Sequence, residues 1–192
     1  MVKVALTGNY GSGKSTVLGI FRRFGAFCIN ADSIVAELLE DKDVLERIRK
    51  TAGSEVFDGS GLSKKKLANI IFTDKAVREA VEGIIHPVVI ARIDGELSRS
   101  DAAVGIIEVP LLYEKSYEGA FDKVIAVYTD ERTALSRLEN SGVSRESAKQ
   151  RLAAQMPIGQ KMKRADYVID NQGNLEETRK QAWRIYKELS NA

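Results

Sequence analysis

Eight residues near the N-terminus form a pattern that binds phosphate chains. They fit G-x-x-x-x-G-K-[ST] at every fixed position: Gly8-Asn9-Tyr10-Gly11-Ser12-Gly13-Lys14-Ser15. Glycines let backbone N–H groups converge on phosphate oxygens, and a following helix adds the positive end of its dipole. The pattern predicts a bound nucleoside triphosphate, with Lys14 at its β- and γ-phosphates and the Ser15 hydroxyl on Mg²⁺. The predicted nucleotide contacts are Gly11, Ser12, Gly13, Lys14, Ser15 and Thr16.

The surroundings of this loop favour phosphate binding over a glycine-rich turn that merely links two elements. A β-rich apolar run at 2–7 leads into Gly8, and a helical pattern leaves directly after Lys14. A GTPase would need an Asn-Lys-x-Asp segment, which the sequence lacks, and a motor or transport ATPase would need a longer chain. The D-x-x-G match at 170–173 has too little chain after it for a guanine site. A small kinase suits the length best.

Asp32 is the candidate for the base that such a kinase needs. It follows a predicted strand at 26–30, and the carboxyl ends of parallel strands share the sheet edge at which the phosphate loop lies. A carboxylate there could accept a proton from an acceptor hydroxyl. Asp is equally a standard helix N-cap, and a helix could begin at Asp32 or Ser33. The position alone leaves both roles open.

A lid over the transferring phosphoryl group would need cations on a mobile helical segment. Helices are predicted after the fourth strand, at 131–140 and 144–155, and four arginines lie on them: Arg132, Arg137, Arg145 and Arg151. Taken singly, an arginine on an amphipathic helix usually faces water. The same expectation holds for the two basic runs of the chain, namely Lys64, Lys65 and Lys66, and Lys161, Lys163 and Arg164.

Strand and helix patterns alternate around a helical stretch, which indicates an α/β class with a mainly parallel sheet. The continuous apolar runs at 103–109 and 123–128 suit strands that are covered on both faces, and 167–169 is a last short strand. Between the second and third strands, residues 34–99 are rich in Lys, Glu and Leu at helical spacing. We expect a mostly helical insertion there.

Local signals mark where several helices begin. Ser63 and Asp74 can cap two helices of the insertion, and Asp58-Gly59-Ser60-Gly61 is a strong turn between them and the preceding helix. Asn174 with Glu177 resembles a capping box and opens a terminal amphipathic helix.

Composition excludes some classes of protein. Lys plus Arg number 29 and Asp plus Glu 27, which gives a formal charge of +2 and argues against a general nucleic-acid or membrane binder. Cys28 is the single cysteine, so no intrachain disulfide can form; its apolar neighbours favour an inert core thiol. No signal pattern or membrane-length apolar run occurs. We expect a soluble, cytoplasmic protein, with its oligomeric state open.

Several segments, in order, resemble the dephospho-CoA kinase family over about residues 2–185. The more particular ones are His86-Pro87, Pro110-Leu111-Leu112-Tyr113-Glu114 and Ala165-Asp166-Tyr167-Val168-Ile169-Asp170-Asn171. Others are Leu6-Thr7-Gly8, Asn30-Ala31-Asp32, Arg137-Leu138 and Gln155. The resemblance implies ATP and dephospho-CoA as substrates, Mg²⁺ as cofactor, and transfer of the γ-phosphoryl group to the ribose 3′-hydroxyl, the last step of coenzyme A synthesis.

The resemblance also implies a P-loop kinase fold with a five-stranded, mainly parallel sheet flanked by helices. The core would comprise 1–33, 101–129 and 156–192. A helical acceptor-binding insertion would comprise 34–100, and a lid 130–155.

For individual residues, the resemblance implies that Asp32 is the general base and that Arg137 is a catalytic lid residue beside Lys14. It puts Asn171 near the adenine of ATP, where the sequence alone suggests a turn residue. Acceptor contacts would be Asp32, His86, Leu111, Tyr113 and Glu114. Without the resemblance, His86-Pro87 would mark a helix boundary, because a residue before proline avoids the helical region, and Pro110–Glu114 an ordinary buried strand end.

Three departures from the family pattern stand out. Glu108 replaces the usual Asp before the Pro-Leu-Leu segment, which shifts any metal-water contact by one methylene. The lid lacks its second arginine, with Ser141 in that place, so either Arg145 supplies the charge or the lid stabilises the transition state less well. Asn9 and Tyr10 replace small and aliphatic residues at variable positions of the loop.

Two other functions remain open at this point. One is a kinase for another small acceptor, such as a nucleoside monophosphate. The other is a nucleotide-dependent regulatory protein with slow hydrolysis, which would bind ATP without acceptor-dependent release of ADP.

Overall fold

The computed structural model describes residues 1–59 and 61–191, and the chain divides into two compact units. The larger unit comprises Met1–Asn30 and Ser100–Ala192, and the smaller one comprises Ala31–Arg99. The boundary follows the second strand directly, because a helix begins at the next residue.

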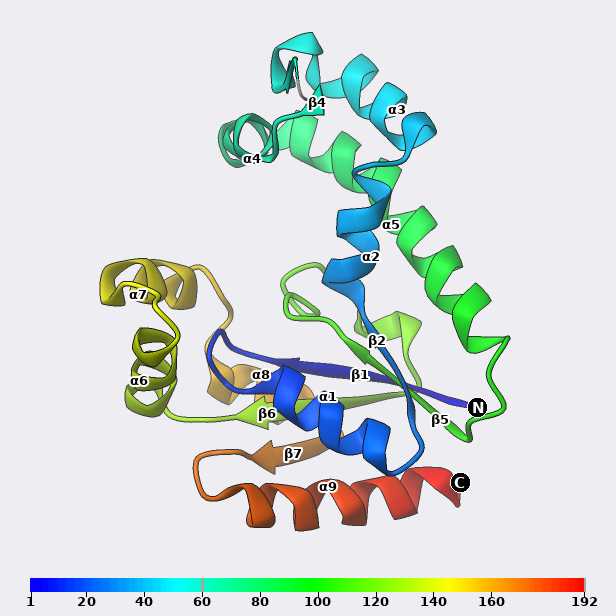
Figure 1. Ribbon diagram of the computed structural model, residues 1–192, viewed down its shortest axis with the longest axis vertical. Coiled ribbons are helices and arrows are strands. Elements are labelled where there is room, and N and C mark those ends of the chain that lie inside the picture. The colour runs from blue at the N-terminus through cyan, green and yellow to red at the C-terminus, as the bar shows by residue number, and fades with distance from the viewer. Residues whose placement is uncertain (60, 192) are drawn as a thin grey trace. The chain divides into compact units, whose positions relative to one another are not determined.

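The larger unit is built on a five-stranded parallel sheet (Figure 1). Its order is β2-β5-β1-β6-β7, and its strands are β1 Val2–Gly8, β2 Phe27–Asn30, β5 Val104–Glu108, β6 Lys123–Tyr128 and β7 Tyr167–Asp170. β5 and most of β6 are buried along their length, as continuous apolar runs predict. The predicted α/β class with a five-stranded parallel sheet is confirmed.

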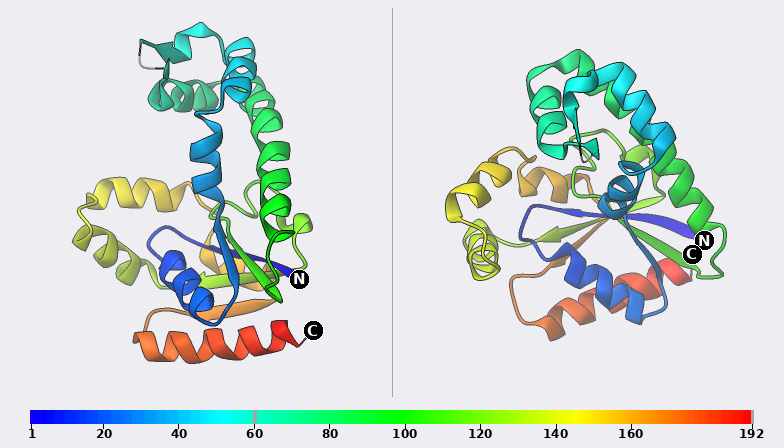
Figure 2. Two further views of the ribbon diagram at one scale, coloured as in Figure 1. Left: turned by 45° about the vertical axis from the view of Figure 1, so that its right-hand side comes forward. Right: turned by 45° about the horizontal axis from the view of Figure 1, so that its top comes forward.

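Helices cover both faces of this sheet (Figures 1 and 2). These are α1 Lys14–Arg23 and α9 Leu175–Ser190 on one face and α8 Ile158–Arg164 on the other. α6 Glu131–Asn140 and α7 Arg145–Ala153 pack against each other beyond the end of β6, and a short 3₁₀ turn, η2, lies at Glu118–Ala120. The Asn174 side chain accepts the Glu177 N–H at 2.9 Å, which confirms the predicted cap of the last helix. The expectations from the sequence do not include α8.

The main hydrophobic core lies where α1 and α9 pack against one face of the sheet. Alternate strand residues such as Val4, Leu6, Ile125 and Val127 point into it. The intervening residues are also fully buried, and α8 contacts β1 and β6. Cys28 packs at the edge of this core, and burial raises the pKa of its thiol to about 11. This agrees with an inert core thiol.

The smaller unit is mostly helical. Its elements are α2 Ala31–Leu38, α3 Lys42–Ala52, η1 Ser54–Val56, β3 Phe57–Asp58, β4 Gly61–Leu62, α4 Lys64–Thr73 and α5 Lys75–Leu97. α5 contacts α2, α3 and α4, and residues such as Ile48, Val56, Leu67 and Val81 form a second core. β3 and β4 pair antiparallel around the predicted turn, of which Ser60 lies outside the described residues.

Three local predictions for this unit differ from the structure. Neither Asp32 nor Ser33 caps α2, because the helix already begins at Ala31 and includes both. His86-Pro87 is not a helix boundary, since α5 continues through Pro87. Proline costs a helix one N–H bond, and the packing of α5 against three neighbours outweighs that loss. Ser63 precedes α4 without a capping hydrogen bond from its side chain, whereas Asp74 caps α5 as predicted.

None of the helices formed by the described residues has the length and apolar character that crossing a bilayer requires.

Candidate active site

The phosphate loop connects β1 to α1 and contains two residues in the left-handed region of backbone space. Gly11 has φ of 79° and Gly13 has φ of 84°, conformations that a side chain would disfavour. Helix α1 begins at the next residue, Lys14, so the N–H groups of its first turn face the loop. This backbone is the arrangement that binds anions at a helix N-terminus.

The loop is fitted closely against its surroundings. A β-carbon on Gly8 would lie 2.5 Å from the Val127 carbonyl oxygen, and one on Gly13 would lie 2.3 Å from Asn171 Nδ2. Lys14 is buried and its Nζ donates to the Asn9 carbonyl at 3.2 Å, which folds the ammonium back over its own loop. Positive charge is therefore held where the phosphates of a nucleotide would lie.

Glu108 lies beside Ser15 at the carboxyl end of β5. The Ser15 hydroxyl is 3.2 Å from Glu108 Oε2, and Asn30 Nδ2 donates to the same oxygen at 3.3 Å. Glu108 is only 5% exposed, so a buried carboxylate faces the hydroxyl that the motif assigns to the metal. The sequence analysis notes Glu108 only as a departure from the family pattern that affects a metal-water contact, and does not count it among the site residues. A charged residue that ends an otherwise apolar strand was a further signal for it.

These oxygen ligands fit Mg²⁺. The ion prefers one or two protein oxygens, with water and substrate phosphates completing an octahedron. The described residues contain no cluster of three or more His, Cys, Asp or Glu that could hold a metal alone. A single carboxylate next to a hydroxyl is therefore the appropriate donor set for a metal that arrives with a nucleotide.

Arg137 on α6 joins the lid helices to the phosphate loop. Its Nη2 donates to the Asn171 carbonyl at 2.7 Å, which anchors one end of the guanidinium. Its Nη1 is buried, has no hydrogen-bond partner among the described residues, and lies 3.6 Å from where a Gly13 β-carbon would stand. The Ser12 hydroxyl is likewise buried without a partner in that part of the chain. Two donors beside the loop are thus left for an anion.

The side-chain amide and the backbone carbonyl of Asn171 all make hydrogen bonds within the protein. Its Nδ2 donates to the Ser12 carbonyl at 2.8 Å, and its Oδ1 accepts from the Thr178 hydroxyl at 2.9 Å. With the Arg137 contact, these bonds connect the end of β7, helix α9, the lid and the loop. In this structure the Asn171 side chain supports the phosphate loop, and its predicted place near adenine remains a prediction.

The other predicted lid arginines have different partners. Arg145 is more than half exposed, and its Nη1 lies 3.1 Å from Glu139 of the lid itself. The guanidinium of Arg151 lies 5.1 Å from the centre of the Tyr10 ring, and Arg151 Nη1 donates to the Tyr10 hydroxyl at 3.2 Å. The Tyr10 N–H donates to Gln155 Oε1 at 2.8 Å. Tyr10, at a variable position of the motif, therefore contacts the segment predicted as the lid through both its ring and its backbone.

The segment Pro110–Glu114 follows β5 and holds three predicted acceptor contacts. Leu111 is exposed, whereas Tyr113 is buried and has Arg164 over its ring at 4.3 Å. Burial raises the pKa of Tyr113, and the nearby Arg164 only partly opposes this. Burial also pushes the pKa of Glu114 up, but hydrogen bonds from Lys161 and the Met156 N–H more than compensate, so the pKa is lowered.

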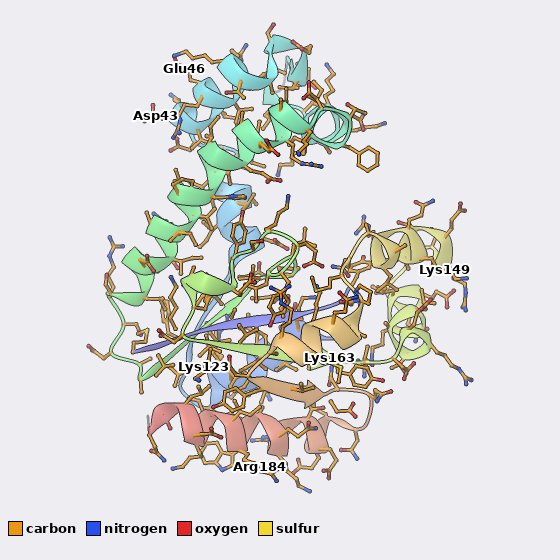
Figure 3. All side chains as sticks on the ribbon, turned by 180° about the vertical axis from the view of Figure 1, so that it is seen from behind. Asp43, Glu46, Lys123, Lys149, Lys163 and Arg184 are labelled. Atoms are coloured by element: carbon orange, nitrogen blue, oxygen red, sulfur yellow. The ribbon has the colours of Figure 1, made fainter. Side chains whose placement is uncertain are left out.

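The prediction that Lys161 faces water is wrong. Its side chain is fully buried, and its Nζ lies 2.8 Å from Glu114 Oε1. The carboxylate of the partly buried Glu114 offsets the loss of hydration that a lysine otherwise suffers in a protein interior. Lys163, two residues further along α8, is exposed as expected, as is Lys149 on α7 (Figure 3).

The remaining predicted residues belong to the smaller unit. Asp32 is exposed in the first turn of α2, and His86 is half-buried in α5. The structure thus brings Lys14, Ser15, Arg137 and Asn171 together within the larger unit. For Asp32 and His86, the roles at the acceptor stay predictions.

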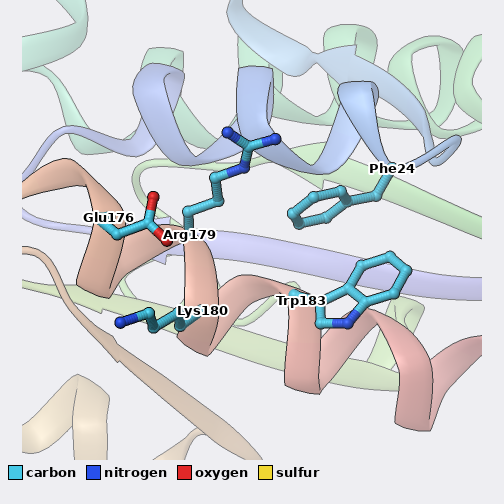
Figure 4. A pocket seen from close by; sticks show the side chains of 5 residues that line it. All are labelled: Phe24, Glu176, Arg179, Lys180 and Trp183. Atoms are coloured by element: carbon cyan, nitrogen blue, oxygen red, sulfur yellow. The ribbon is translucent and has the colours of Figure 1, made fainter.

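A separate hollow of about 340 Å³ lies on the larger unit and is lined by Phe24, Glu176, Arg179, Lys180 and Trp183 (Figure 4). Phe24 follows the last residue of α1, at the opposite end of that helix from Lys14. None of the predicted site residues lines this hollow. It is therefore distinct from the phosphate loop.

Comparison with known sequences gives a consistent family. The family model for dephospho-CoA kinase matches residues 2–177 of this chain. The dephospho-CoA kinase of Aquifex aeolicus is 38% identical over 193 residues, covering 99% of this chain and 98% of its own. That of Symbiobacterium thermophilum is 42% identical over 191 residues, covering 94% of this chain and 80% of its own.

Solved structures agree. A Thermus thermophilus protein has a TM-score of 0.89 at 34% identity and covers 97% of this chain and 96% of its own. Dephospho-CoA kinase from Campylobacter jejuni has a TM-score of 0.68 at 29% identity, covering 98% and 96%. Shikimate kinase from Bacteroides thetaiotaomicron has a TM-score of 0.54 at 14% identity, covering 98% of each chain, and shares the P-loop kinase fold alone.

Proposed function

The chain belongs to the dephospho-CoA kinase family, and from this premise we propose that it transfers the γ-phosphoryl group of ATP to the ribose 3′-hydroxyl of dephospho-CoA. The observation that carries the proposal is the phosphate loop with its two unsatisfied donors. A helix N-terminus, Lys14, the Ser12 hydroxyl and Arg137 Nη1 all belong to this loop or lie beside it. Together they suit the charge of a phosphate chain.

Each residue has a distinct part in this mechanism. The loop backbone and Lys14 hold the β- and γ-phosphates, and Arg137 adds charge where negative charge grows in the transition state. Because Asn171 fixes one end of its guanidinium, the other end is aimed before the reaction starts. Preorganised donors of this kind avoid the cost of reorienting during the reaction.

Ser15 and Glu108 would hold Mg²⁺ with the phosphates of the nucleotide. When bound, the ion neutralises charge on the β- and γ-oxygens. Asn30 keeps the Glu108 carboxylate directed at the Ser15 hydroxyl through its own hydrogen bond. The longer Glu, in place of the usual Asp, is already in hydrogen-bond reach of that hydroxyl.

We assign the acceptor side to Asp32, His86 and the segment that contains Leu111, Tyr113 and Glu114. Asp32 would orient and deprotonate the ribose hydroxyl. Covalent geometry alone keeps its α-carbon within about 7 Å of that of Asn30, a neighbour of Glu108. The helical residues 34–100 would bind the coenzyme moiety, and 130–155 would close as the lid, in a cytoplasmic enzyme.

The decisive experiment is release of ADP from Mg-ATP with dephospho-CoA, adenosine monophosphate or cytidine monophosphate as acceptor. We expect strong stimulation by dephospho-CoA alone. Turnover on a monophosphate without turnover on dephospho-CoA would contradict the proposed acceptor. Binding of ATP with no acceptor-dependent turnover at all would contradict a kinase.

The same assay tests Asp32. Asp32→Asn keeps the shape of the side chain and removes its basicity, so we expect kcat to fall by about 10²- to 10⁴-fold. The affinity for ATP, measured by titration with a non-hydrolysable analogue, should stay within about twofold. Equal losses in turnover and ATP affinity would contradict the role as base.

A further inference from the structure

Lys161 is a fully buried cation that the proposed mechanism does not use. It lies on α8, and both of its described bonds go to one short segment. Its Nζ is 2.8 Å from Glu114 Oε1 and donates to the Pro110 carbonyl at 3.0 Å. These partners are the first and last residues of Pro110–Glu114. One ammonium group therefore binds both ends of this segment.

Each end of the segment has a second bond to a functional part of the larger unit. The Pro110 carbonyl also accepts from the Thr7 hydroxyl of β1 at 3.4 Å, next to the phosphate loop. Glu114 Oε1 also accepts the Met156 N–H at 2.8 Å, and the preceding residue, Gln155, binds the Tyr10 N–H. The position of the segment is thereby fixed relative to both the loop and the base of the lid.

A buried ion pair is a costly way to attach a helix to a sheet. The ammonium group loses all of its hydration and the largely covered carboxylate loses most of its own, and apolar side chains of similar volume would often attach the helix as firmly. What the pair adds is specificity, because the ammonium group must stay within hydrogen-bond distance of two particular oxygens, whereas an apolar contact tolerates displacement. The pair therefore suits a segment whose exact backbone position matters.

We infer that Lys161 is a positioning residue for the acceptor, acting through Pro110 and Glu114 to fix the segment that carries Leu111 and Tyr113. This inference rests on the proposed function, because that function makes the segment part of the acceptor site. Lys161 does not touch the reacting atoms. Its loss should therefore loosen acceptor binding and leave nucleotide binding intact.

The test uses the full chain and the variant Lys161→Met, which keeps an unbranched side chain and removes the charge. We expect KM for dephospho-CoA to rise about tenfold or more and KM for ATP to stay within about twofold. Amide hydrogen exchange should quicken at Leu112–Tyr117 and stay unchanged at residues 8–16. Equal rises in both KM values, or unchanged exchange at Leu112–Tyr117, would overturn the inference.

Leu189→Ala is the matched control for a general loss of stability. Leu189 is buried in α9, within the same unit, and lies outside the site. It should lower the thermal midpoint without separating the two KM values. If it raises KM for dephospho-CoA as selectively as Lys161→Met, the role assigned to Lys161 is wrong.

Glu114→Gln provides a milder variant in case Lys161→Met does not fold. It leaves Lys161 its bond to Pro110 and should raise KM for dephospho-CoA in the same direction. Because the two residues act as one unit, the double variant should lose little more than the worse single variant. Full additivity would contradict action through Glu114. Absence of dephospho-CoA turnover in the unmodified enzyme would instead overturn the proposed function, while the exchange result still decides whether Lys161 holds the segment.

Discussion

Gly13 lies at the tightest point of the phosphate loop. Its φ of 84° disfavours any side chain, and a β-carbon would stand 2.3 Å from the amide of Asn171. Gly13→Ala must therefore either change the loop conformation or break the bond from Asn171 to Ser12. We expect the dissociation constant of an ATP analogue to rise about 10- to 100-fold, corresponding to about 1–3 kcal/mol of backbone strain.

Gly19 provides the control for that measurement. It lies inside α1, and an added β-carbon would meet nothing within 4 Å. Gly19→Ala should leave nucleotide affinity unchanged and stabilise the protein by about 0.5–1 kcal/mol, because alanine favours a helix more than glycine does. Similar losses of affinity in both variants would show that close packing at Gly13 is not the cause.

Arg137 and Arg145 test which lid arginine acts on the phosphoryl group. Arg137 has a free donor beside Gly13, whereas Arg145 is exposed and paired with Glu139. Arg137→Met should lower kcat by about 10³-fold or more, as loss of an arginine that stabilises phosphoryl transfer does. Arg145→Met should change kcat by no more than about twofold, because exposed ion pairs contribute little. A large effect of Arg145→Met would show that it supplies the missing lid charge.

Single residues were predictable where a motif fixes both type and spacing, as it does for Lys14 and Ser15. Lys161 and Glu108 could not be recognised in this way. Each is one charged residue whose partner is distant in sequence, 47 positions away for Lys161 and Glu114 and 93 for Glu108 and Ser15. Only the folded chain brings such partners together. When its partner cannot be seen in the sequence, a lysine in a basic run is reasonably expected to face water.

At the scale of elements, attachment of α8 should depend on pH. Hydrogen bonds from Lys161 and Met156 lower the pKa of Glu114 in spite of its burial. A carboxyl group whose pKa is lower in the folded protein stabilises the fold above its unfolded pKa of about 4.3, and this contribution is lost as pH falls through the lowered value. Urea unfolding from pH 7 to pH 3 should therefore show a smaller loss of stability in Glu114→Gln than in the unmodified protein.

Glu46→Gln is the comparison for that pH series. A hydrogen bond from Lys50 lowers the pKa of Glu46 as well, but the pair is exposed on α3. Water and salt screen such a pair, so Glu46→Gln should follow the unmodified protein closely. Parallel curves for all three proteins would show that Glu114 contributes no pH-dependent stability.

The sequence predicts the bounds of helices and strands well where hydrophobic periodicity is strong. It predicts them less well where tertiary packing determines whether a helix forms or continues. The predicted bounds of β6 and α6, 123–128 and 131–140, match the structure because hydrophobic periodicity is a local signal. Pro87 misleads because contacts of α5 with three other helices, which lie outside any local window, keep the helix intact. α8 is not predicted for a related reason, since the one buried residue among its seven is a lysine, which no apolar pattern would indicate.

At the scale of the molecule, we expect a bound nucleotide to protect amides of the larger compact unit and not those of the smaller one. Mg²⁺ with a non-hydrolysable ATP analogue should slow amide exchange at residues 8–16 and near Asn171, because binding favours the closed form of those amides. Exchange in α3 and α4, which form the core of the smaller unit, should not change. Lys14→Met or a chelator should remove the protection. Equal protection in both units would indicate that they respond to the nucleotide as one body.

The fold class is visible in the sequence, whereas the exact boundary between the units is not, because the helical insertion is expected from residue 34 and the smaller unit begins at Ala31. Buried parallel strands produce continuous apolar runs, which are local and easily recognised. The unit boundary at Asn30 carries no proline, glycine or polar linker, because β2 ends there and α2 begins at Ala31. Only contacts between distant segments define it.

The single thiol gives the protein a practical property. With a pKa of about 11, Cys28 is deprotonated in about one molecule in ten thousand at neutral pH, and the thiolate is the form that maleimides attack. A cysteine placed at exposed Lys149 on α7 would therefore take a fluorophore almost alone, with the native thiol left in place. A change in the surroundings of α7 during turnover, which the predicted role of 130–155 as a lid requires, could then be followed spectroscopically.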